Sequence, residues 1–242
     1  MSLALRSNQA PHLSICRGED VSRVIVCGSP ERAEYISGFI KNARLIGKHR
    51  EYHSFLGEFE SKQVLVCSHG VGASGAAICF RELISLGAKK IIRLGTAGGL
   101  QSELGHGSII VARGSVRDEG VTHQMLPSSV PAIPNFELTL QLERSLAELG
   151  CTFRSGMILT RDLYYDEVLS SDYSMWSRLG LLAVEMEASA LFVLGLIHGI
   201  ETAAMFALDG NLMLNDDSMF DPNPAHLEVS MRSMVLAGLQ AI

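Results

Sequence analysis

The chain has few cysteines, and their spacing argues against the usual structural roles of cysteine. It contains five, an odd number, spread from Cys16 to Cys151 without a Cys-x-x-Cys pair. This pattern predicts neither a zinc site nor a disulfide framework. Two of them, Cys27 and Cys67, lie in apolar runs and are expected to be buried as small hydrophobic side chains. Because unpaired cysteines fit a reducing compartment, we expect a cytoplasmic protein.

Positive charge is also in short supply. The chain has 20 lysines and arginines against 26 aspartates and glutamates, a formal net charge of −6, and no basic cluster. Since nucleic-acid binding depends on concentrated positive charge, we expect no nucleic-acid partner. No apolar run reaches the roughly 18–20 residues that cross a bilayer. Residues 1–6 lack the charged and apolar regions of a signal peptide, so we expect no membrane association.

What the chain does have is apolar bulk. Of its 242 residues, 47% are hydrophobic and only 19% are charged. This composition is typical of a compact globular protein with a large core. A modest charged surface also suits a chain that buries area against other subunits.

Short apolar runs alternate with amphipathic segments along the chain. The runs predict strands at residues 21–28, 44–60 (a hairpin), 63–68, 89–94, 108–115, 153–160, 181–186 and 202–208. The amphipathic segments predict helices at residues 31–40, 76–86, 136–149, 188–198 and 225–242. No linker, repeat or low-complexity tract divides the chain. The alternation predicts one α/β domain over residues 1–242, a three-layer α/β/α fold with a mixed, largely parallel central sheet.

The most informative stretch is Ile-Ile-Arg-Leu-Gly-Thr-Ala-Gly-Gly-Leu, residues 91–100. It begins as a buried strand, carries Arg93 inside the apolar run, and then breaks into small residues that include Thr96. Small residues let backbone N–H groups approach a ligand, and an upstream arginine suits an oxyanion such as phosphate. The alternative is an ordinary strand exit in which Arg93 pairs with a carboxylate.

Two further strand ends are followed directly by helices. Residues 28–32, Gly-Ser-Pro-Glu-Arg, place Pro30 at a helix start and Arg32 in the first turn, where anions are attracted. Alternatively, Arg32 is an ordinary surface arginine. Residues 69–75 repeat the pattern but match neither the Walker A motif nor the dinucleotide-binding fingerprint. His69 fits a catalytic base or, more simply, a turn histidine with satisfied hydrogen bonds.

Acidic residues stand near the carboxyl ends of two predicted strands. The run Val-Glu-Met-Glu-Ala, residues 184–188, ends an apolar strand with two carboxylates, which are costly to bury without partners. Asp209 follows another strand, at a position where α/β sheets place ligand sites. Before Gly210 it also fits a turn former. The polar segment 211–224 that follows is a candidate lid.

Taken together, these motifs resemble the nucleoside phosphorylase family that includes hexameric purine nucleoside phosphorylases and uridine phosphorylases. The resemblance covers nearly the whole chain and rests on five motifs in family order, at residues 28–32, 68–72, 91–98, 184–187 and 209–210. Residues 50–52 and 162–165, with residues 209–210, look most like the purine nucleoside phosphorylases of apicomplexan parasites. The resemblance implies the nucleoside phosphorylase fold.

The resemblance also implies a role for each matching position. The phosphate-binding positions are matched by Gly28, Arg32, Arg93, Thr96 and, from a neighbouring subunit, Arg50. The ribose-binding positions are matched by Val71, Met186, Glu187 and, from a neighbouring subunit, His12. The base-binding positions are matched by Tyr164, Val184 and Asp209. The implied assembly is a homohexamer built as a trimer of dimers.

The implied reaction is the reversible phosphorolysis of inosine and guanosine to a free purine base and ribose 1-phosphate, a step of purine salvage. Bound phosphate places negative charge beneath an oxocarbenium-like transition state. Electron density accumulates on the leaving purine, so Asp209, facing N7, acts as catalytic acid if burial raises its pKa. Glu187 accepts hydrogen bonds from the ribose hydroxyls. No metal or organic cofactor is expected, and inorganic phosphate is a co-substrate.

The sequence departs from the family pattern in places. Ser29 replaces an acid that orders the first loop, which puts the rigidity of that loop in question. Leu208 stands where many bacterial relatives have serine, so a 6-amino preference is not assumed. The Gln-x-Arg pair with which uridine phosphorylases bind the pyrimidine is not evident after Thr160, which favours purine over uracil. The alternatives are a uridine phosphorylase, a nucleosidase that uses water, and an inactive nucleoside-binding sensor. The retained arginines argue against the nucleosidase, and the arginines and acids together argue against the sensor.

Overall fold

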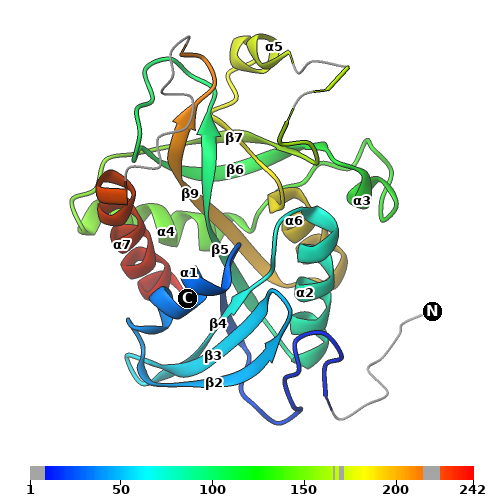
Figure 1. Ribbon diagram of the computed structural model, residues 1–242, viewed down its shortest axis with the longest axis vertical. Coiled ribbons are helices and arrows are strands. Elements are labelled where there is room, and N and C mark those ends of the chain that lie inside the picture. Colours follow the sequence, from blue (N-terminus) through cyan, green and yellow to red (C-terminus); the bar gives the residue numbers. More distant parts are fainter. Residues whose placement is uncertain (1–8, 166, 169–171, 215–223) are drawn as a thin grey trace.

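The computed structural model describes residues 9–165, 167–168, 172–214 and 224–242 (Figure 1). Its strands are β1 (Arg23–Cys27), β2 (Lys41–His49), β3 (Tyr52–Phe59), β4 (Lys62–Ser68), β5 (Lys90–Gly99), β6 (Ile109–Asp118), β7 (Phe153–Arg161), β8 (Ala183–Glu185) and β9 (Glu201–Asn211). Its helices are α1 (Pro30–Ser37), α2 (Ala73–Leu86), α3 (Gly120–His123), α4 (Phe136–Glu148), α5 (Tyr173–Arg178), α6 (Ala188–His198) and α7 (Pro224–Ala241). The predicted alternation of strands and helices is confirmed.

These strands join one mixed sheet, in the order β2-β3-β4-β1-β5-β8-β7-β6-β9. The pairs β4–β1, β1–β5 and β5–β9 are parallel, whereas β2–β3 and β3–β4 are antiparallel. An additional pairing between β5 and β9 closes the strands β5, β8, β7, β6 and β9 into a ring. Because every strand of the ring is paired on both sides, its register is fixed from two directions.

Apolar cores lie on both faces of the sheet, because successive strand residues point to opposite sides. Helices α1, α4 and α7 cover one face, whose core includes Ile92 (Figure 1). Helices α2 and α6 cover the other face, whose core includes the adjacent Ile91. Both isoleucines are fully buried, as expected of a central strand that is apolar on both faces. The predicted α/β/α layering is confirmed.

Strands β5 and β9 continue beyond their predicted ends. The sequence predicted that the central strand ends at residue 94 in a glycine-rich break, yet β5 pairs with β9 from Lys90 to Gly99. A Cβ atom at Gly95 would lie 2.9 Å from Cδ1 of Phe206, so this glycine permits close packing between the strands. The break prediction was wrong because glycine in a strand has the same sequence signature as glycine in a turn.

Two short helices occupy segments for which the sequence predicted none. Helix α3 lies between the predicted strand at residues 108–115 and the predicted helix at residues 136–149, and the Glu119 side chain caps it. Helix α5 is capped by Asp172, which accepts a hydrogen bond from the Met175 N–H at 3.0 Å. Helices of four and six residues are too short to show an apolar period. Within the described ranges, no helix combines the length and the apolar character needed to cross a membrane.

Candidate active site

Asp209 lies at a β-bulge near the carboxyl end of β9. Residues 97 and 98 of β5 pair with residues 208 and 210 of β9, so Asp209 is the extra residue of the bulge. The backbone just before it is fixed, because Leu208 bonds to residues 107 and 108 through its C=O (2.8 Å) and its N–H (3.0 Å). Bulges redirect one side chain and recur beside active sites. The bulge therefore gives Asp209 an orientation that a regular strand would not.

The surroundings of Asp209 favour its neutral form. Burial raises the pKa of its carboxyl group. A hydrogen bond with Thr96 and the charges of Arg32 and His106 act in the opposite direction without outweighing burial. Burial also raises the pKa of Tyr164, which is 62% exposed, and the nearby Asp209 charge adds to that rise. The structure thus brings Asp209 close both to predicted phosphate-binding residues and to a predicted wall of the base pocket.

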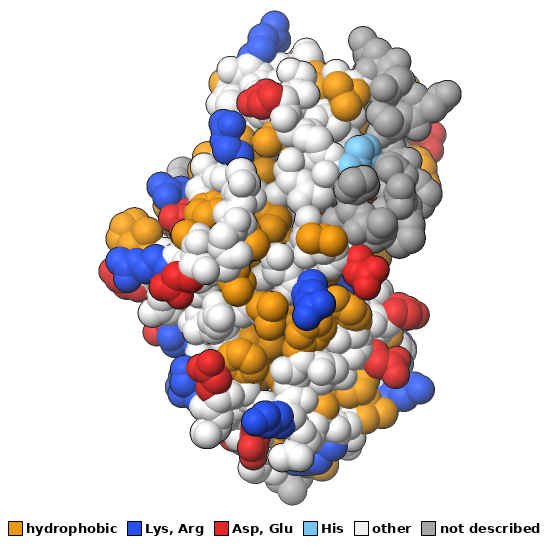
Figure 2. Space-filling model, turned by 90° about the vertical axis from the view of Figure 1, so that its left-hand side faces the viewer, with side chains coloured by type: hydrophobic (Ala, Val, Ile, Leu, Met, Phe, Trp, Pro, Cys, Tyr) orange, Lys and Arg blue, Asp and Glu red, His pale blue; other side chains and the backbone are white. Residues whose placement is uncertain are grey.

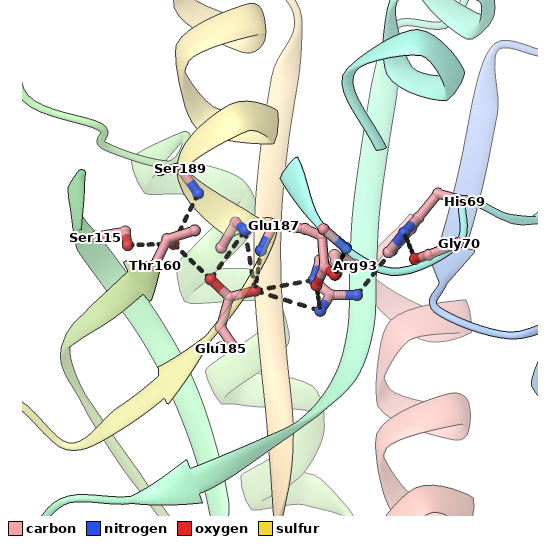
Figure 3. Close-up of polar contacts among 10 residues, drawn as sticks. His69, Gly70, Arg93, Ser115, Thr160, Glu185, Glu187 and Ser189 are labelled. Carbon is pink, nitrogen blue, oxygen red and sulfur yellow. Dashed lines mark hydrogen bonds and ion pairs between the residues drawn. The ribbon is translucent and has the colours of Figure 1, made fainter. Parts of the chain in front are cut away.

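Arg93 is a buried cation held by three side chains (Figure 3). It is only 4% exposed and donates from Nε to Oε2 of Glu185 at 3.3 Å, from Nη2 to Glu187, and from Nη1 to Nε2 of His69 at 2.7 Å. Its guanidinium also packs over the Phe206 ring, 5.3 Å from the centroid. Burial opposes the charge of Arg93, but Glu187 and Glu185 outweigh burial and raise its pKa. Arg93 is therefore a buried cation, as predicted, and it is also paired with carboxylates, as the alternative interpretation predicted.

His69 holds Arg93 as a neutral acceptor. Because an arginine only donates, Nε2 of His69 must accept, and Nδ1 carries the proton donated to the Gly70 carbonyl oxygen at 2.7 Å. Burial and, after it, the charge of Arg93 hold the pKa of His69 well below its usual range. Both ring nitrogens are occupied, which confirms the prediction of a turn histidine with satisfied hydrogen bonds. Neither nitrogen is available as a catalytic base.

The two carboxylates of the 184–188 run have separate tasks. Glu185 caps helix α6 by accepting hydrogen bonds from the N–H groups of Glu187 at 2.9 Å and Ala188 at 3.0 Å. Glu187 precedes the helix but makes no capping bond with its own side chain. Its carboxylate instead accepts from the Gly72 N–H at 2.6 Å and from Arg93. The role of Glu185 was not predicted, and its one signal was a carboxylate inside an apolar run.

The first turn of α1 places Arg32 close enough to Asp209 and Glu187 for their charges to influence one another. Ser29 caps this helix, since its hydroxyl oxygen accepts from the Arg32 N–H at 3.2 Å, and Pro30 begins the helix as predicted. Serine is among the preferred capping residues, so the loop keeps an ordered end despite the lost acid. Arg32 lines a hollow of about 330 Å³ between α1 and α7. It makes no ion pair within the described part of the chain, and burial lowers its pKa.

Several predicted residues lie around this cluster without joining it. Gly28 follows β1, and a Cβ atom there would lie 4.0 Å from the Gly70 carbonyl oxygen. Val184 pairs with Gly98 of β5. Met186 is half-buried between the two glutamates. The candidate lid lies largely outside the described residues, since 215–223 are among those left out.

Arg50 and His12, which are expected to serve a neighbouring subunit, make no ion pair with the Arg93 cluster in the part of the chain that the structure describes. Arg50 is exposed in the turn between β2 and β3, in the left-handed backbone region with φ of 54°. His12 is bonded through Nδ1 to Glu82 of α2 at 2.6 Å. Val71, expected to line the sugar, is 78% exposed in the turn before α2. Their assigned roles stay predictions.

Comparisons with known proteins agree on the family. The phosphorylase superfamily model matches residues 22–232. A purine nucleoside phosphorylase of Plasmodium vivax is 32% identical over 221 residues, 90% of each chain. A uridine phosphorylase of Treponema pallidum is 31% identical over 221 residues, 87% of this chain and 86% of that one. A crystal structure of purine nucleoside phosphorylase from Toxoplasma gondii in complex with immucillin-H matches at a TM-score of 0.93 and 30% identity, covering 97% of this chain and 95% of that chain. The chain therefore belongs to the phosphorylase superfamily, and it is a nucleoside phosphorylase.

Proposed function

We propose that this nucleoside phosphorylase acts on purine nucleosides, by reversible phosphorolysis of inosine and guanosine to the free base and ribose 1-phosphate. Asp209 carries the proposal, because a partly buried acid with a raised pKa is suited to protonate N7 of a leaving purine. Its proximity to Tyr164, a candidate wall of the base pocket along with Val184, supports this role. Uracil has no N7, so an acid in this role favours a purine.

Phosphate is assigned to Gly28, Arg32, Arg93 and Thr96, the positions that the family resemblance implies. Arg32 supports the assignment because it adds a cation to the N-terminus of α1, where anions are already favoured. Thr96 supports it with a hydroxyl that also bonds Asp209. Phosphate held there would place negative charge beneath the cationic sugar of the transition state. Inorganic phosphate is the co-substrate in this proposal, which includes no metal or organic cofactor.

Ribose is assigned to the neighbourhood of Glu187. Its carboxylate is held by Arg93 and by the Gly72 N–H, which gives it a defined position from which to accept hydrogen bonds from the sugar hydroxyls. Met186 next to it and the exposed Val71 would line the sugar. A diol in this place would also explain why a second carboxylate ends an apolar strand.

The charge of the site supports a contribution from a neighbouring subunit. Within one chain, Arg32 and Arg93 carry two positive charges and Glu185 and Glu187 carry two negative ones, so these four residues have no net positive charge when Asp209 is protonated. Holding a phosphate dianion calls for a further cation. We infer that Arg50 of a neighbouring subunit supplies it, and that His12 reaches the neighbour's ribose 5′-hydroxyl, in a hexamer built as a trimer of dimers.

We further propose a cytoplasmic location. All five cysteines of the chain are free. Burial raises the pKa of the Cys27 thiol to about 12, so this thiol stays protonated and unreactive. Free cysteines of this kind are typical of a reducing compartment.

Uridine is the second candidate substrate, because a uridine phosphorylase is about as similar to this chain as a purine nucleoside phosphorylase. The residue after Thr160 is an arginine, yet its guanidinium lies 3.9 Å from Asp118 and 5.5 Å from the centre of the Tyr173 ring. Leu159 stands two residues before this arginine, so it does not complete the Gln-x-Arg pair of uridine phosphorylases. We therefore rank purine first.

The deciding experiment offers inosine, guanosine, adenosine and uridine to the purified protein, each with and without inorganic phosphate. Phosphate-dependent release of hypoxanthine and guanine, with uridine unreacted, is the expected result. Cleavage of uridine alone would overturn the purine assignment. Cleavage without phosphate would make the protein a nucleosidase, and nucleoside binding without cleavage would make it a sensor.

A further inference from the structure

A group of buried hydroxyls meets the Arg93 cluster from the side opposite His69 (Figure 3). The Thr160 hydroxyl, on β7, donates a hydrogen bond to Oε1 of Glu185. The Ser115 hydroxyl, on β6, lies 2.7 Å from the Thr160 hydroxyl, and the Ser189 N–H donates to it at 3.1 Å. Thr160 is fully buried and Ser115 nearly so. None of these three residues has a place in the reaction proposed above.

The direction of each hydrogen bond follows from what the groups can donate. The Glu185 carboxylate only accepts, so the single hydroxyl proton of Thr160 points to it. The oxygen of Thr160 then accepts from the Ser189 N–H and from the Ser115 hydroxyl, whose oxygen is closer to Thr160 (2.7 Å) than to its other acceptor, the Val116 carbonyl oxygen (3.2 Å). The Thr160 hydroxyl is thereby fixed from three directions, which removes the rotation that a threonine side chain usually retains.

The two oxygens of the Glu185 carboxylate bind different side chains, Thr160 and Arg93. Its Oε1 accepts from Thr160, its Oε2 accepts from Arg93 and from the Glu187 N–H, and the Ala188 N–H lies 3.0 Å from both oxygens. The two backbone N–H groups hold the carboxylate at the start of α6, and Thr160 and Arg93 are the side chains that hold its Oε1 and its Oε2. Turning the plane of the carboxylate would change where Arg93 donates.

We propose that Thr160 is a positioning residue whose hydroxyl orients Glu185, so that Arg93 and Glu187 are held where phosphate and ribose bind. This inference rests on the function proposed above. A merely structural role of the hydroxyl, as a fastener between strands, is less economical, because the backbones of β7 and β8 already pair Thr160 with Glu185. The backbone pairing brings Thr160 and Glu185 together, and the hydroxyl of Thr160 then fixes the orientation of the Glu185 carboxylate.

The test measures inorganic phosphate binding by titration calorimetry on the full-length variants Thr160→Val, Thr160→Ser and Thr139→Val. Valine keeps the shape of threonine and removes the hydroxyl, whereas serine keeps the hydroxyl. Thr139 provides the matched control: it is buried in α4, and its hydroxyl donates to the Asn135 carbonyl oxygen at 2.8 Å, outside the site. Thermal unfolding of each variant reports whether it folds.

We expect Thr160→Val to bind phosphate about tenfold more weakly or worse, as for a lost hydrogen bond to a charged group. Thr160→Ser and Thr139→Val should bind as the wild type does. Equal binding by wild type and Thr160→Val would overturn the proposal, as would equal weakening by valine and serine. Should valine fail to fold, Thr160→Ala, which leaves room for a water molecule, replaces it in the comparison with serine.

This test separates the inference from the proposed function. The phosphate titration needs no nucleoside, so a wild type that binds phosphate and cleaves only uridine loses the purine assignment but leaves the role of Thr160 open to the same comparison. Conversely, a wild type that cleaves inosine with phosphate and is matched in phosphate affinity by Thr160→Val would lose only the positioning role.

Discussion

At the scale of single residues, Arg93 shows the conditions under which a charge survives burial. Its guanidinium has two carboxylates, a histidine nitrogen and an aromatic face around it, so little of its lost hydration goes uncompensated. The histidine contributes by being neutral, since a second cation at 2.7 Å would oppose the first. The arginine is therefore part of the folded core as well as a candidate phosphate ligand.

Replacing Arg93 should accordingly cost stability. Arg93→Ala leaves Glu185 and Glu187 buried without their cation, and we expect a loss of about 3–5 kcal/mol in the free energy of unfolding, measured by chemical denaturation. Arg32→Ala removes a cation without such partners, so we expect a loss of about 1 kcal/mol or less. That variant should still need far more phosphate for half-maximal rate. Comparable stability of the two variants would contradict this account of the cluster.

Asp209 should determine turnover and its dependence on pH. Asp209→Ala is expected to lower turnover on inosine by about 10²-fold or more, the scale of a general acid. Burial places the folded-state pKa of Asp209 above the unfolded value, so activity should be present below that raised pKa and decline as the pH rises through it. Wild-type turnover by Asp209→Ala would end the assignment.

The raised pKa of Asp209 also predicts how stability depends on pH. The free energy of unfolding of the wild type should fall as the pH rises through that pKa, because the carboxyl group must then ionise while partly buried. Asp209→Asn should lose less stability than the wild type over the same rise in pH. Asp20→Asn, an exposed position, serves as the control.

At the scale of elements, strand β5 makes room for the Arg93 side chain because it has a glycine, Gly95, beside it. The Arg93 guanidinium and the Phe206 ring occupy the space beside Gly95, where a Cβ atom would lie 3.1 Å from Cζ of Arg93 and 2.9 Å from the ring. Gly95→Ala should therefore displace Arg93, destabilise the fold by about 1–3 kcal/mol, and raise the phosphate requirement of the reaction.

The control for Gly95→Ala is Gly105→Ala, in the connection between β5 and β6. A Cβ atom there meets nothing within 4 Å, so we expect stability and phosphate requirement to stay near those of the wild type. Denaturation and phosphate titration of the steady-state rate measure both quantities. Equal effects of the two substitutions would mean that the packing beside Gly95 has no special part in holding Arg93.

Elements were predictable where their residue pattern is local. Apolar runs gave the strands, and Asn135 and Ser29 lie at helix starts, where their side chains accept hydrogen bonds from the backbone of α4 and α1. The extension of β5 and the closed ring were not predictable, because both depend on pairing with β9, more than 100 residues away. The same holds within the site: the sequence pointed to Arg93 and Glu187, but the contacts of Thr160 and Glu185 depend on how β7 meets β8.

At the scale of the whole molecule, the surface suits association with other copies. Figure 2 shows apolar side chains gathered in the middle of one face, with charged side chains around them. Exposed apolar side chains include Tyr35 on α1, at 36%, and Val229 on α7, at 70%. Apolar area of this kind is typical of proteins that bury surface between subunits.

A mixing experiment tests whether sites are shared between subunits. Arg50→Ala and Asp209→Ala chains should each have strongly reduced activity alone. If Arg50 serves the neighbour's site, co-assembled chains contain sites with both residues intact, about a quarter of all sites for random two-fold pairs. We therefore expect activity to return on co-expression, measured as phosphate-dependent inosine cleavage. Arg32→Ala mixed with Asp209→Ala is the matched control, because both residues belong to one chain's site and no mixed site is complete.

The ring of five strands separates the groups assigned to phosphate and ribose, which lie on paired strands, from exposed residues that follow β7. The groups assigned to phosphate and ribose lie on β5, β8 and adjacent segments. Each strand of the ring is paired on both sides, so a shift in one strand would displace the strands next to it. Tyr164 and Tyr165 leave the ring after β7 and are 62% and 77% exposed. Because Tyr164 is a candidate wall of the base pocket, we expect a substitution there to alter the choice of base while leaving the buried Arg93 cluster intact. Such a separation is consistent with the nearly equal identity of this chain to a purine nucleoside phosphorylase, 32%, and to a uridine phosphorylase, 31%.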